Sequence, residues 1–368
     1  MIPEPALLDG IRVVDLTSNV AAPFGAAVLA DLGAHVTHVE GPGGDDSRRM
    51  APTIGSSSAY FTVVNRNKDG VRLDIRIAED RARLDEMITG ADVFVCNLRP
   101  GKLEKYALDS ESLCARFPTL IHATLSAYGS IGAERDKPGY DAVLQARTGI
   151  ASVTGTADGP PVRAGVSILD VGAGTWLALG VVAALFRRER TGLGGAVATS
   201  LFETGANWVG YHVAAQQVSG APSGRHGSGH PAFAPYGIFR TGDGDICLGI
   251  GGDVLFARLC EALGLDDLVA DDRFRTNEAR VRNAVHLRTL LEDSMSASSA
   301  ADVADRLGSA GLPADAVRLP EDLLRDPQAA ANAVLQSVPL AGGRELLMPG
   351  LPLTFDGIRP PFRSAAPE

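Results

Sequence analysis

The chain has 368 residues, of which 45% are hydrophobic and 21% charged, which predicts an ordered globular protein with a substantial core and two domains. Its net charge of −10 argues against a general nucleic-acid binder but allows a local basic pocket. Its four cysteines lack metal-ligand spacing and its N-terminus lacks a signal-peptide pattern, so we expect a soluble cytoplasmic protein with reduced thiols and no metal site.

Predicted strands and helices alternate along roughly the first 200 residues. A strand over 11–16, a helix over 21–32 and a strand over 34–40 form a β-α-β unit. Further elements are expected as strands over 71–75, 93–96 and 120–125 and as a helix over 78–89. This alternation predicts a parallel, doubly wound α/β sheet. The Gly-x-Gly-x-x-Gly motif of a dinucleotide site does not follow the first strand.

A carboxylate, Asp170, stands at a predicted strand-to-helix junction. Residues 166–170 are interpreted as a short buried strand, and the apolar run 176–186, too short for the ~20 residues of a bilayer span, as a buried helix. At this junction Asp170 can cap the helix by accepting amide hydrogen bonds. Alternatively, it can act as a nucleophile toward an activated acyl group. This segment alone leaves both interpretations open.

The composition changes at about residue 219, where a loop rich in glycine, serine and proline begins. Two strands that flank 242–244 give a strong hairpin signal. Helices are expected over 256–263, 277–294 and 300–310. We therefore assign a large domain to 1–220, a smaller α+β domain to 225–325, and a tail without periodicity of its own to 330–368.

Sequence blocks that are individually weak occur in a specific order and spacing along nearly the whole chain. They are LDGIRVVDLT at 8–17, LADLGAHV at 29–36, NRNK at 65–68, NLRPG at 97–101, GYD at 139–141 and DVGAG at 170–174. Together they resemble the class III CoA-transferases, which include formyl-CoA and carnitine CoA-transferases, and the related α-methylacyl-CoA racemases.

The resemblance implies a particular fold and reaction. The tail over 330–368 would return to complete a Rossmann-like large domain, and two chains would interlock like rings in a homodimer. The enzyme would move CoA from an acyl-CoA donor to a carboxylic acid through an aspartyl anhydride and an enzyme–CoA thioester. Acyl-CoA is then a substrate, and no cofactor is bound permanently. Succinyl-CoA is a common donor in this family, so a short dicarboxylate pair is the corresponding expectation.

By the same resemblance, Asp170 occupies the nucleophile position, and the helix start is expected to help hold it ionised. CoA needs cations for its phosphates and an apolar channel for its pantetheine arm. The residues expected along its path are Val20, Ala21, Leu73, Arg76, Asn97, Leu98, Arg99, Lys105 and Tyr140, the last near the reacting thioester. Arg99 and Lys105 have the alternative of being solvated surface charges.

The chain departs from the family pattern at two positions. Family members often carry Gln where Val20 stands, and some carry Arg where Gly41 follows Glu40. The first departure concerns a polar group near the reacting carboxylate, and the second concerns contacts to adenine. The sequence therefore leaves the oxyanion-stabilising and adenine-binding groups open.

Two alternative functions remain. A racemase pairs the equivalent aspartate with a histidine, on opposite faces of the carbon beside the thioester. That histidine typically stands where this chain has Tyr140, and a phenol is a poorer base than an imidazole at neutral pH, which favours the transferase. The other alternative is an inactive acyl-CoA-binding protein, against which Asp170 argues. The glycine-rich loop over 227–229 could close over an intermediate or serve as a linker.

Overall fold

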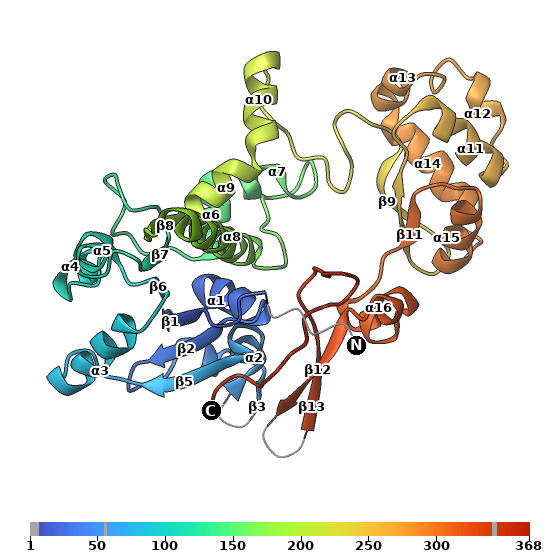
Figure 1. Ribbon diagram of the computed structural model, residues 1–368. Coiled ribbons are helices and arrows are strands. Elements are labelled where there is room, and N and C mark those ends of the chain that lie inside the picture. Colours follow the sequence, from blue (N-terminus) through green and yellow to red (C-terminus); the bar gives the residue numbers. More distant parts are fainter. Residues whose placement is uncertain (1–6, 55–56, 341–343) are drawn as a thin grey trace. The chain divides into compact units, whose positions relative to one another are not determined.

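The computed structural model describes residues 7–54, 57–340 and 344–368 (Figure 1). The chain divides into two compact units. The first contains 1–150, 163–214 and 324–368, and the second contains 151–162 and 215–323. The short segment 151–162, which the sequence interpretation kept in the large domain, thus groups with the second unit.

A six-stranded parallel sheet forms the centre of the first unit, and its strand order is β5-β2-β1-β6-β7-β8. The strands are β1 (Arg12–Leu16), β2 (His35–Glu40), β5 (Lys68–Arg72), β6 (Val93–Cys96), β7 (Ile121–Ser126) and β8 (Gly195–Ser200). In chain order this is the 3-2-1-4-5-6 arrangement of a doubly wound fold. The predicted parallel α/β sheet is confirmed.

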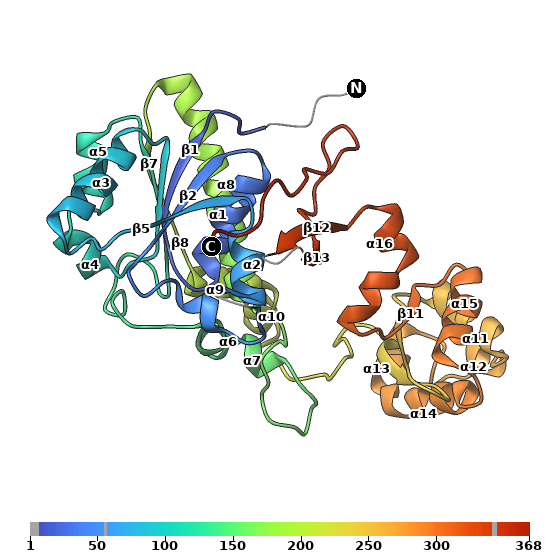
Figure 2. The same cartoon turned by 90° about the horizontal axis from the view of Figure 1, so that it is seen from below.

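Helices cover both faces of this sheet (Figure 2). On one face α1 (Ala21–Asp31) and α8 (Ile168–Thr191) pack in a core that includes Val13 of β1. On the other face α3 (Ala78–Thr89), α4 (Pro100–Lys105) and α5 (Ser110–Arg116) pack in a core that includes Val14. Because successive side chains of a strand point to opposite faces, the adjacent residues Val13 and Val14 of β1 contribute to different cores.

Helix α8 corrects one sequence-based interpretation. The predicted strand over 166–170 is wrong, because the helix begins at Ile168 and its buried positions, starting with Leu169, already follow helical spacing. Val166 is 67% exposed rather than buried. α8 has 24 residues, and with a mean hydropathy of 1.8 over an 18-residue stretch it is long and apolar enough to cross a membrane, but half of that stretch is buried against the sheet and α1. It is a core helix.

Glycines bring α1 and α8 into close contact. A Cβ atom at Gly174 would lie 2.4 Å from the carbonyl oxygen of Ala21, and one at Gly25 would lie 2.7 Å from the carbonyl oxygen of Gly174. Only glycine permits this approach, because those distances are shorter than any ordinary carbon–oxygen contact. The contact fixes the N-terminal end of α1 beside the first turns of α8.

A buried polar cluster links β1, β2 and β5. Lys68 Nζ donates to Asp15 Oδ2 at 2.8 Å and to Asn65 Oδ1 at 2.8 Å, and His38 Nδ1 lies 3.1 Å from the same Asp15 oxygen. Burial alone would raise the pKa of Asp15, but the charges of Lys68 and His38 outweigh it and hold that pKa below the usual range. The side chains of Asp15, His38 and Lys68 are fully buried.

Two predicted boundaries differ from the structure. The strand expected over 71–75 is β5 at Lys68–Arg72, because the buried pairing of Lys68 starts the strand earlier and a turn at Asp74 ends it. The helix expected over 277–294 is two helices, α13 (Asn277–Arg282) and α14 (Ala284–Met295), divided at Asn283, whose φ of −109° and ψ of 23° are not helical.

The second unit has a sheet and a core of its own. Its antiparallel sheet has the order β11-β10-β9, and the predicted hairpin is confirmed by β9 (Tyr236–Arg240) and β10 (Asp245–Gly249). The other elements are β11 (Ala314–Ala316), α11 (Asp253–Leu263), α12 (Asp267–Ala270) and α15 (Ala300–Ser309). Apolar side chains of this sheet and of α11, α14 and α15 form one core.

The C-terminal segment packs against the N-terminal part of the first unit. A hairpin of β12 (Leu335–Leu340) and β13 (Arg344–Pro349) precedes it. The amide of Arg363 donates to Asn67 Oδ1 at 2.5 Å, and its guanidinium donates to Ala30 O at 2.6 Å near the end of α1. The remaining elements are η1 (Asp46–Arg49), β3 (Thr53–Ile54), β4 (Ser57–Ser58), α2 (Ala59–Asn65), α6 (Asp141–Thr148), α7 (Ile150–Val153), α9 (Leu201–Trp208), α10 (Gly210–Ser219), η2 (Pro320–Arg325) and α16 (Pro327–Ala331).

Candidate active site

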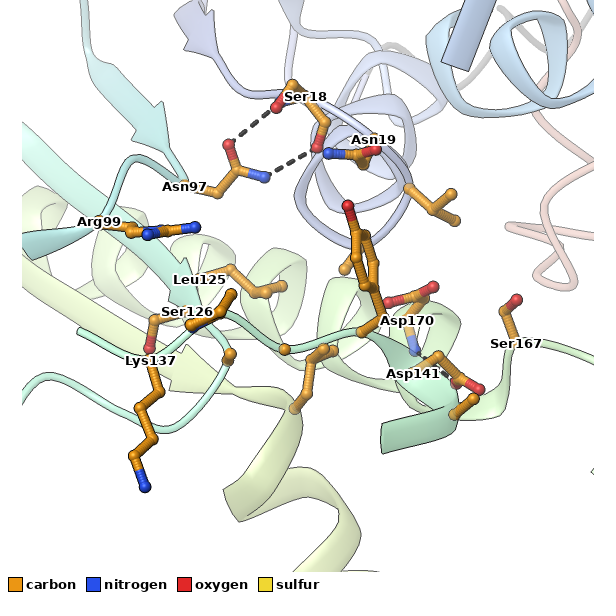
Figure 3. A pocket seen from close by; sticks show the side chains of 18 of the residues that line it. Ser18, Asn19, Asn97, Arg99, Leu125, Ser126, Lys137, Asp141, Ser167 and Asp170 are labelled. Atoms are coloured by element: carbon orange, nitrogen blue, oxygen red, sulfur yellow. Dashed lines mark hydrogen bonds between the residues drawn. The ribbon is translucent and has the colours of Figure 1, made fainter. Parts of the chain in front are cut away.

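The candidate site lies where the sheet changes its winding direction. Strands β1 and β6 are neighbours, yet α1 and α4, which follow them, lie on opposite faces. In doubly wound folds the loops that diverge at such a switch point leave a crevice at the carboxyl ends of the strands. Here Asn97 bridges the two loops: its Oδ1 accepts from Ser18 N at 3.1 Å and its Nδ2 donates to Ser18 O at 2.8 Å (Figure 3).

Two adjoining hollows open beside this bridge, and both are lined by Ser18, Asn97 and Leu98. The first hollow, of about 520 Å³, also contains predicted residues from the starts of α1, α4, α6 and α8, namely Val20, Ala21, Arg99, Tyr140 and Asp170. The second hollow, of about 380 Å³, adds the remaining predicted residues, namely Leu73, Arg76 and Lys105. Every residue proposed from the sequence for catalysis or CoA binding therefore lines one of two neighbouring hollows.

Asp170 occupies the third position of α8, with Ser167 at the N-cap. The helix-capping interpretation of Asp170 is wrong, because the acceptor at this helix start is Asp141, the first residue of α6. Its Oδ2 accepts from Leu169 N at 2.7 Å and from Asp170 N at 3.4 Å. The carboxyl group of Asp170 makes no hydrogen bond or ion pair within the described residues, and it lies in the first hollow.

The charge state of Asp170 differs from the sequence-based expectation. Burial raises its pKa from the ordinary 3.8 to about 7, and the negative charge of Asp141 adds to the rise. The start of a helix favours a nearby anion by about 0.3–1 kcal/mol, which is less than these two costs. A ligand-free site at pH 7 therefore holds a mixture of ionised and neutral Asp170.

Asp141 and Gln145 form a buried clamp that the sequence interpretation did not find. Gln145 Nε2 donates to Asp141 Oδ1 at 2.5 Å, and Gln145 Oε1 accepts from Ala164 N at 2.8 Å. Gln145 is fully buried and Asp141 is 6% exposed. The clamp therefore binds both ends of the segment that leads into α8. The available signal was the spacing of Asp141 and Gln145, which puts two polar side chains on one face of a helix directly after Tyr140.

Several cations surround the second hollow. Arg76 pairs with Asp74 at 2.7 Å, Lys105 Nζ lies 5.5 Å from the ring of Tyr106, and Lys102 lines the wall. Gly41, one of the two departures from the family pattern, lines the same hollow. A phosphorylated ligand would find its counter-charges here, beside an apolar wall that includes Leu73.

The first hollow has cations that the sequence interpretation left out. Arg135 pairs with Glu104 at 3.0 Å, and Lys137 pairs with Glu134 at 2.8 Å. A further cation, Arg163, belongs to the segment that Gln145 anchors. These residues fall in an irregular stretch between β7 and α8, where neither periodicity nor a motif identifies pocket residues.

The glycine-rich loop over 227–229 belongs to the second unit. Gly227 N donates to Gly155 O at 2.9 Å, and Gly227 adopts a positive φ of 61°. The loop lines a separate hollow of about 520 Å³ together with His226 and His230. The role of this loop stays a prediction.

A doubly wound sheet with its hollows at the switch point is the arrangement of an α/β enzyme that binds a nucleotide-containing ligand. The family model described as CoA-transferase family III matches residues 8–368. The chain belongs to this family and is a class III CoA-transferase.

Individual relatives are similar over nearly their whole lengths. The chain is 36% identical to the acetyl-CoA:oxalate CoA-transferase of Acetobacter aceti, covering 98% of this chain and 92% of that protein. It is 32% identical to the succinate–glutarate CoA-transferase of Agrobacterium fabrum, with the same two coverages. Among solved structures, a CaiB/BaiF family protein from Brucella suis is 33% identical with a TM-score of 0.88, covering 99% of this chain and 96% of that one.

Proposed function

We propose that this enzyme transfers CoA from an acyl-CoA donor to a carboxylic acid, with Asp170 as the covalent nucleophile. The observation that carries the proposal is the position of Asp170: a half-buried carboxyl group in the first hollow, without a structural partner in the described part of the chain. A carboxyl group that is costly to bury and stabilises nothing else is typical of a catalytic position.

The reaction balances without ATP or a net proton. An Asp170 carboxylate oxygen attacks the acyl carbon of the donor thioester, the CoA thiolate leaves, and a mixed anhydride forms. The thiolate then attacks Cγ of Asp170, which releases the donor acid and leaves an aspartyl–CoA thioester. The acceptor carboxylate attacks Cγ and expels the thiolate, and the thiolate takes the new acyl group and restores Asp170. Each step exchanges one activated acyl bond for another.

We assign the second hollow to the nucleotide end of CoA and the first to its acyl end. Arg76 and Lys105 line the second hollow and can meet the phosphates, while Val20 and Ala21 line the first. Tyr140, which is 68% exposed at the start of α6, would contact the reacting thioester. Acyl-CoA is bound as a substrate, so no permanent cofactor is assigned.

The wider organisation belongs to the same proposal. Residues 1–220, apart from the segments 151–162 and 215–220, form a CoA-binding large domain with the tail over 330–368, 225–325 form a small domain, and two chains interlock in a cytoplasmic homodimer. The contacts of Arg363 with Asn67 and Ala30 support the return of the tail. The donors and acceptors printed for the relatives, acetyl-CoA with oxalate and succinate with glutarate, support short acids, with succinyl-CoA as a candidate donor.

Trapping of the covalent intermediate tests the proposal. Incubation with an acyl-CoA donor followed by hydroxylamine or borohydride should modify Asp170, as detected by peptide mass spectrometry, and Asp170→Asn should abolish the modification. No label at Asp170 with any donor that supports turnover would exclude this nucleophile. Hydrogen exchange at the carbon beside the thioester, in the absence of an acid acceptor, would instead support the racemase reaction.

A further inference from the structure

Among the described residues, the first hollow contains one cation, Arg163, that neither the fold nor the assigned CoA path uses. Arg135 and Lys137 are each paired with a glutamate, and Arg99, which also lines the first hollow, is already assigned to the CoA path. In Figure 3 Arg99 and Lys137 lie on the side of the view opposite to Asp170 and Ser167. Arg163 makes no ion pair with any acid in the described ranges 7–54, 57–340 and 344–368.

The guanidinium of Arg163 is only partly engaged. One of its nitrogens, Nη1, donates to Ala164 O at 2.8 Å and to Gly165 O at 3.4 Å. Its Nε and Nη2 have no hydrogen bond to the described part of the chain, and the side chain is exposed to the hollow. An arginine stays charged at any physiological pH, and the two unused nitrogens form the fork that fits a carboxylate.

Arg163 is also held in a fixed relation to the nucleophile. The next residue, Ala164, is anchored through its amide to Gln145, which is bonded to Asp141. Asp141 in turn accepts from the amides of Leu169 and Asp170. The buried clamp therefore ties the backbone beside Arg163 to the backbone of Asp170, so the segment does not behave as a loose surface loop.

We propose, resting on the assignment of Asp170 as nucleophile, that Arg163 binds the distal carboxylate of the acyl group and that the acids exchanged are therefore dicarboxylic. The acyl carbon must reach Asp170, so the rest of the acyl group lies in the first hollow beside this clamp. A second carboxylate in that hollow needs a cation without another partner, and Arg163 is such a cation. A monocarboxylic acyl group of equal length has no distal carboxylate to pair with Arg163, so Arg163 adds no binding free energy for it.

Identity exchange tests this without knowledge of the natural acceptor. Each acyl-CoA is incubated with its own ¹³C-labelled acid, and the label entering the acyl-CoA is followed by mass spectrometry. The donors form matched pairs of equal chain length: malonyl- with propionyl-CoA, succinyl- with butyryl-CoA, and glutaryl- with valeryl-CoA. The variants are Arg163→Gln and Arg163→Lys. The control is Arg190→Gln, which removes one positive charge at an exposed position of α8, about 30 Å along the helix from Asp170 at 1.5 Å per residue.

Wild-type enzyme should exchange at least one dicarboxylic acid about tenfold to a hundredfold faster than its monocarboxylic match, which is the range for one charge-assisted contact. Arg163→Gln should remove that preference by slowing only the dicarboxylic member, Arg163→Lys should retain part of it, and Arg190→Gln should preserve it. Equal slowing of both members by Arg163→Gln, or a wild-type preference for the monocarboxylic member in every pair, would overturn the inference. In that result Asp170 is still labelled, whereas absence of label with a donor that the enzyme does exchange would refute the nucleophile itself.

Discussion

Replacement of Asp170 by asparagine should stabilise the folded protein at pH 8. The substitution keeps the size of the side chain and removes the charge that burial and Asp141 disfavour. Below pH 3.8 the carboxyl group is protonated in folded and unfolded chains alike, so the charge costs nothing. Between pH 3.8 and about 7 the unfolded chain releases the proton while the folded protein keeps it, so stability falls as pH rises. Above about pH 7 Asp170 is ionised in both states, and the full free-energy cost of its buried charge lowers the stability of the folded protein.

The size of this effect follows from the pKa. A rise from 3.8 to about 7 corresponds to about 4 kcal/mol. Because Asp170 is only half-buried in an open hollow, solvent screening and the favourable helix start reduce the value, and we expect about 1–3 kcal/mol. For a domain of roughly 150–250 residues, each kcal/mol raises Tm by about 2–4 °C.

Thermal and urea unfolding of wild-type and Asp170→Asn protein at pH 5, 6, 7 and 8, at one protein concentration throughout, would measure the stabilisation that the substitution causes. The stabilisation should grow from pH 5 to pH 8. Asp69→Asn, at an exposed position of β5 without an ion pair in the described part of the chain, is the matched control and should show no such trend. A pH-independent difference, or a less stable variant at pH 8, would refute the assignment of a raised pKa to Asp170.

The remaining predictions concern catalysis and packing. In wild-type enzyme kcat/KM should rise through pH 7 as Asp170 ionises, and Asp141→Asn should move that midpoint to lower pH; an unmoved midpoint in the pH profile would contradict the coupling. Lys68→Ala should cost about 3–5 kcal/mol in urea unfolding, because it removes the lysine charge from the buried carboxylate of Asp15 in β1, and a loss below about 1 kcal/mol would argue against that cluster. Gly174→Ala should lower the free energy of unfolding by about 1–3 kcal/mol and slow acylation, because the added Cβ separates α1 from α8. Its control is Gly308→Ala, which has open space around its Cβ position and should leave the acylation rate unchanged and the stability unchanged or raised.

Much of the fold is predictable from the sequence because its signals are local. The β-α-β pattern at the N-terminus, the helix over Ala78–Thr89 and the strand over Val93–Cys96 follow from periodicity and from glycine turns. The start of α8 was missed because Val166 and Ile168 are β-branched, which favours a strand when residues are considered singly. In the folded protein a carboxylate distant in the chain, Asp141, supplies the cap that makes a helix start there.

The candidate site, like the fold, is predictable from the sequence only in part. The family blocks bring Asp170, Tyr140 and the Asn97 bridge to one place, because each block marks a strand end or a helix start at the switch point. Arg163 lies outside any pattern that a single sequence offers, and the clamp leaves only two polar residues, Asp141 and Gln145, at helical spacing. Their importance depends on hydrogen bonds between segments that are distant in sequence, which only the folded chain supplies.

The clamp that places Asp170 also makes its charge costly, and this has a consequence for catalysis. In the anhydride and in the aspartyl–CoA thioester the side chain of residue 170 is neutral, so burial and the neighbouring charge of Asp141 no longer oppose it. The surroundings of residue 170 therefore lower the free energy of both covalent intermediates relative to that of the free enzyme with ionised Asp170. The stabilisation gained by Asp170→Asn at pH 8 measures the same free energy, since asparagine is neutral in the same surroundings. About 1–3 kcal/mol corresponds to about a fivefold to 150-fold shift toward the covalent intermediates. We therefore expect the stability of the asparagine variant and the accumulation of the trapped intermediate to change together with pH, because both depend on the same buried charge.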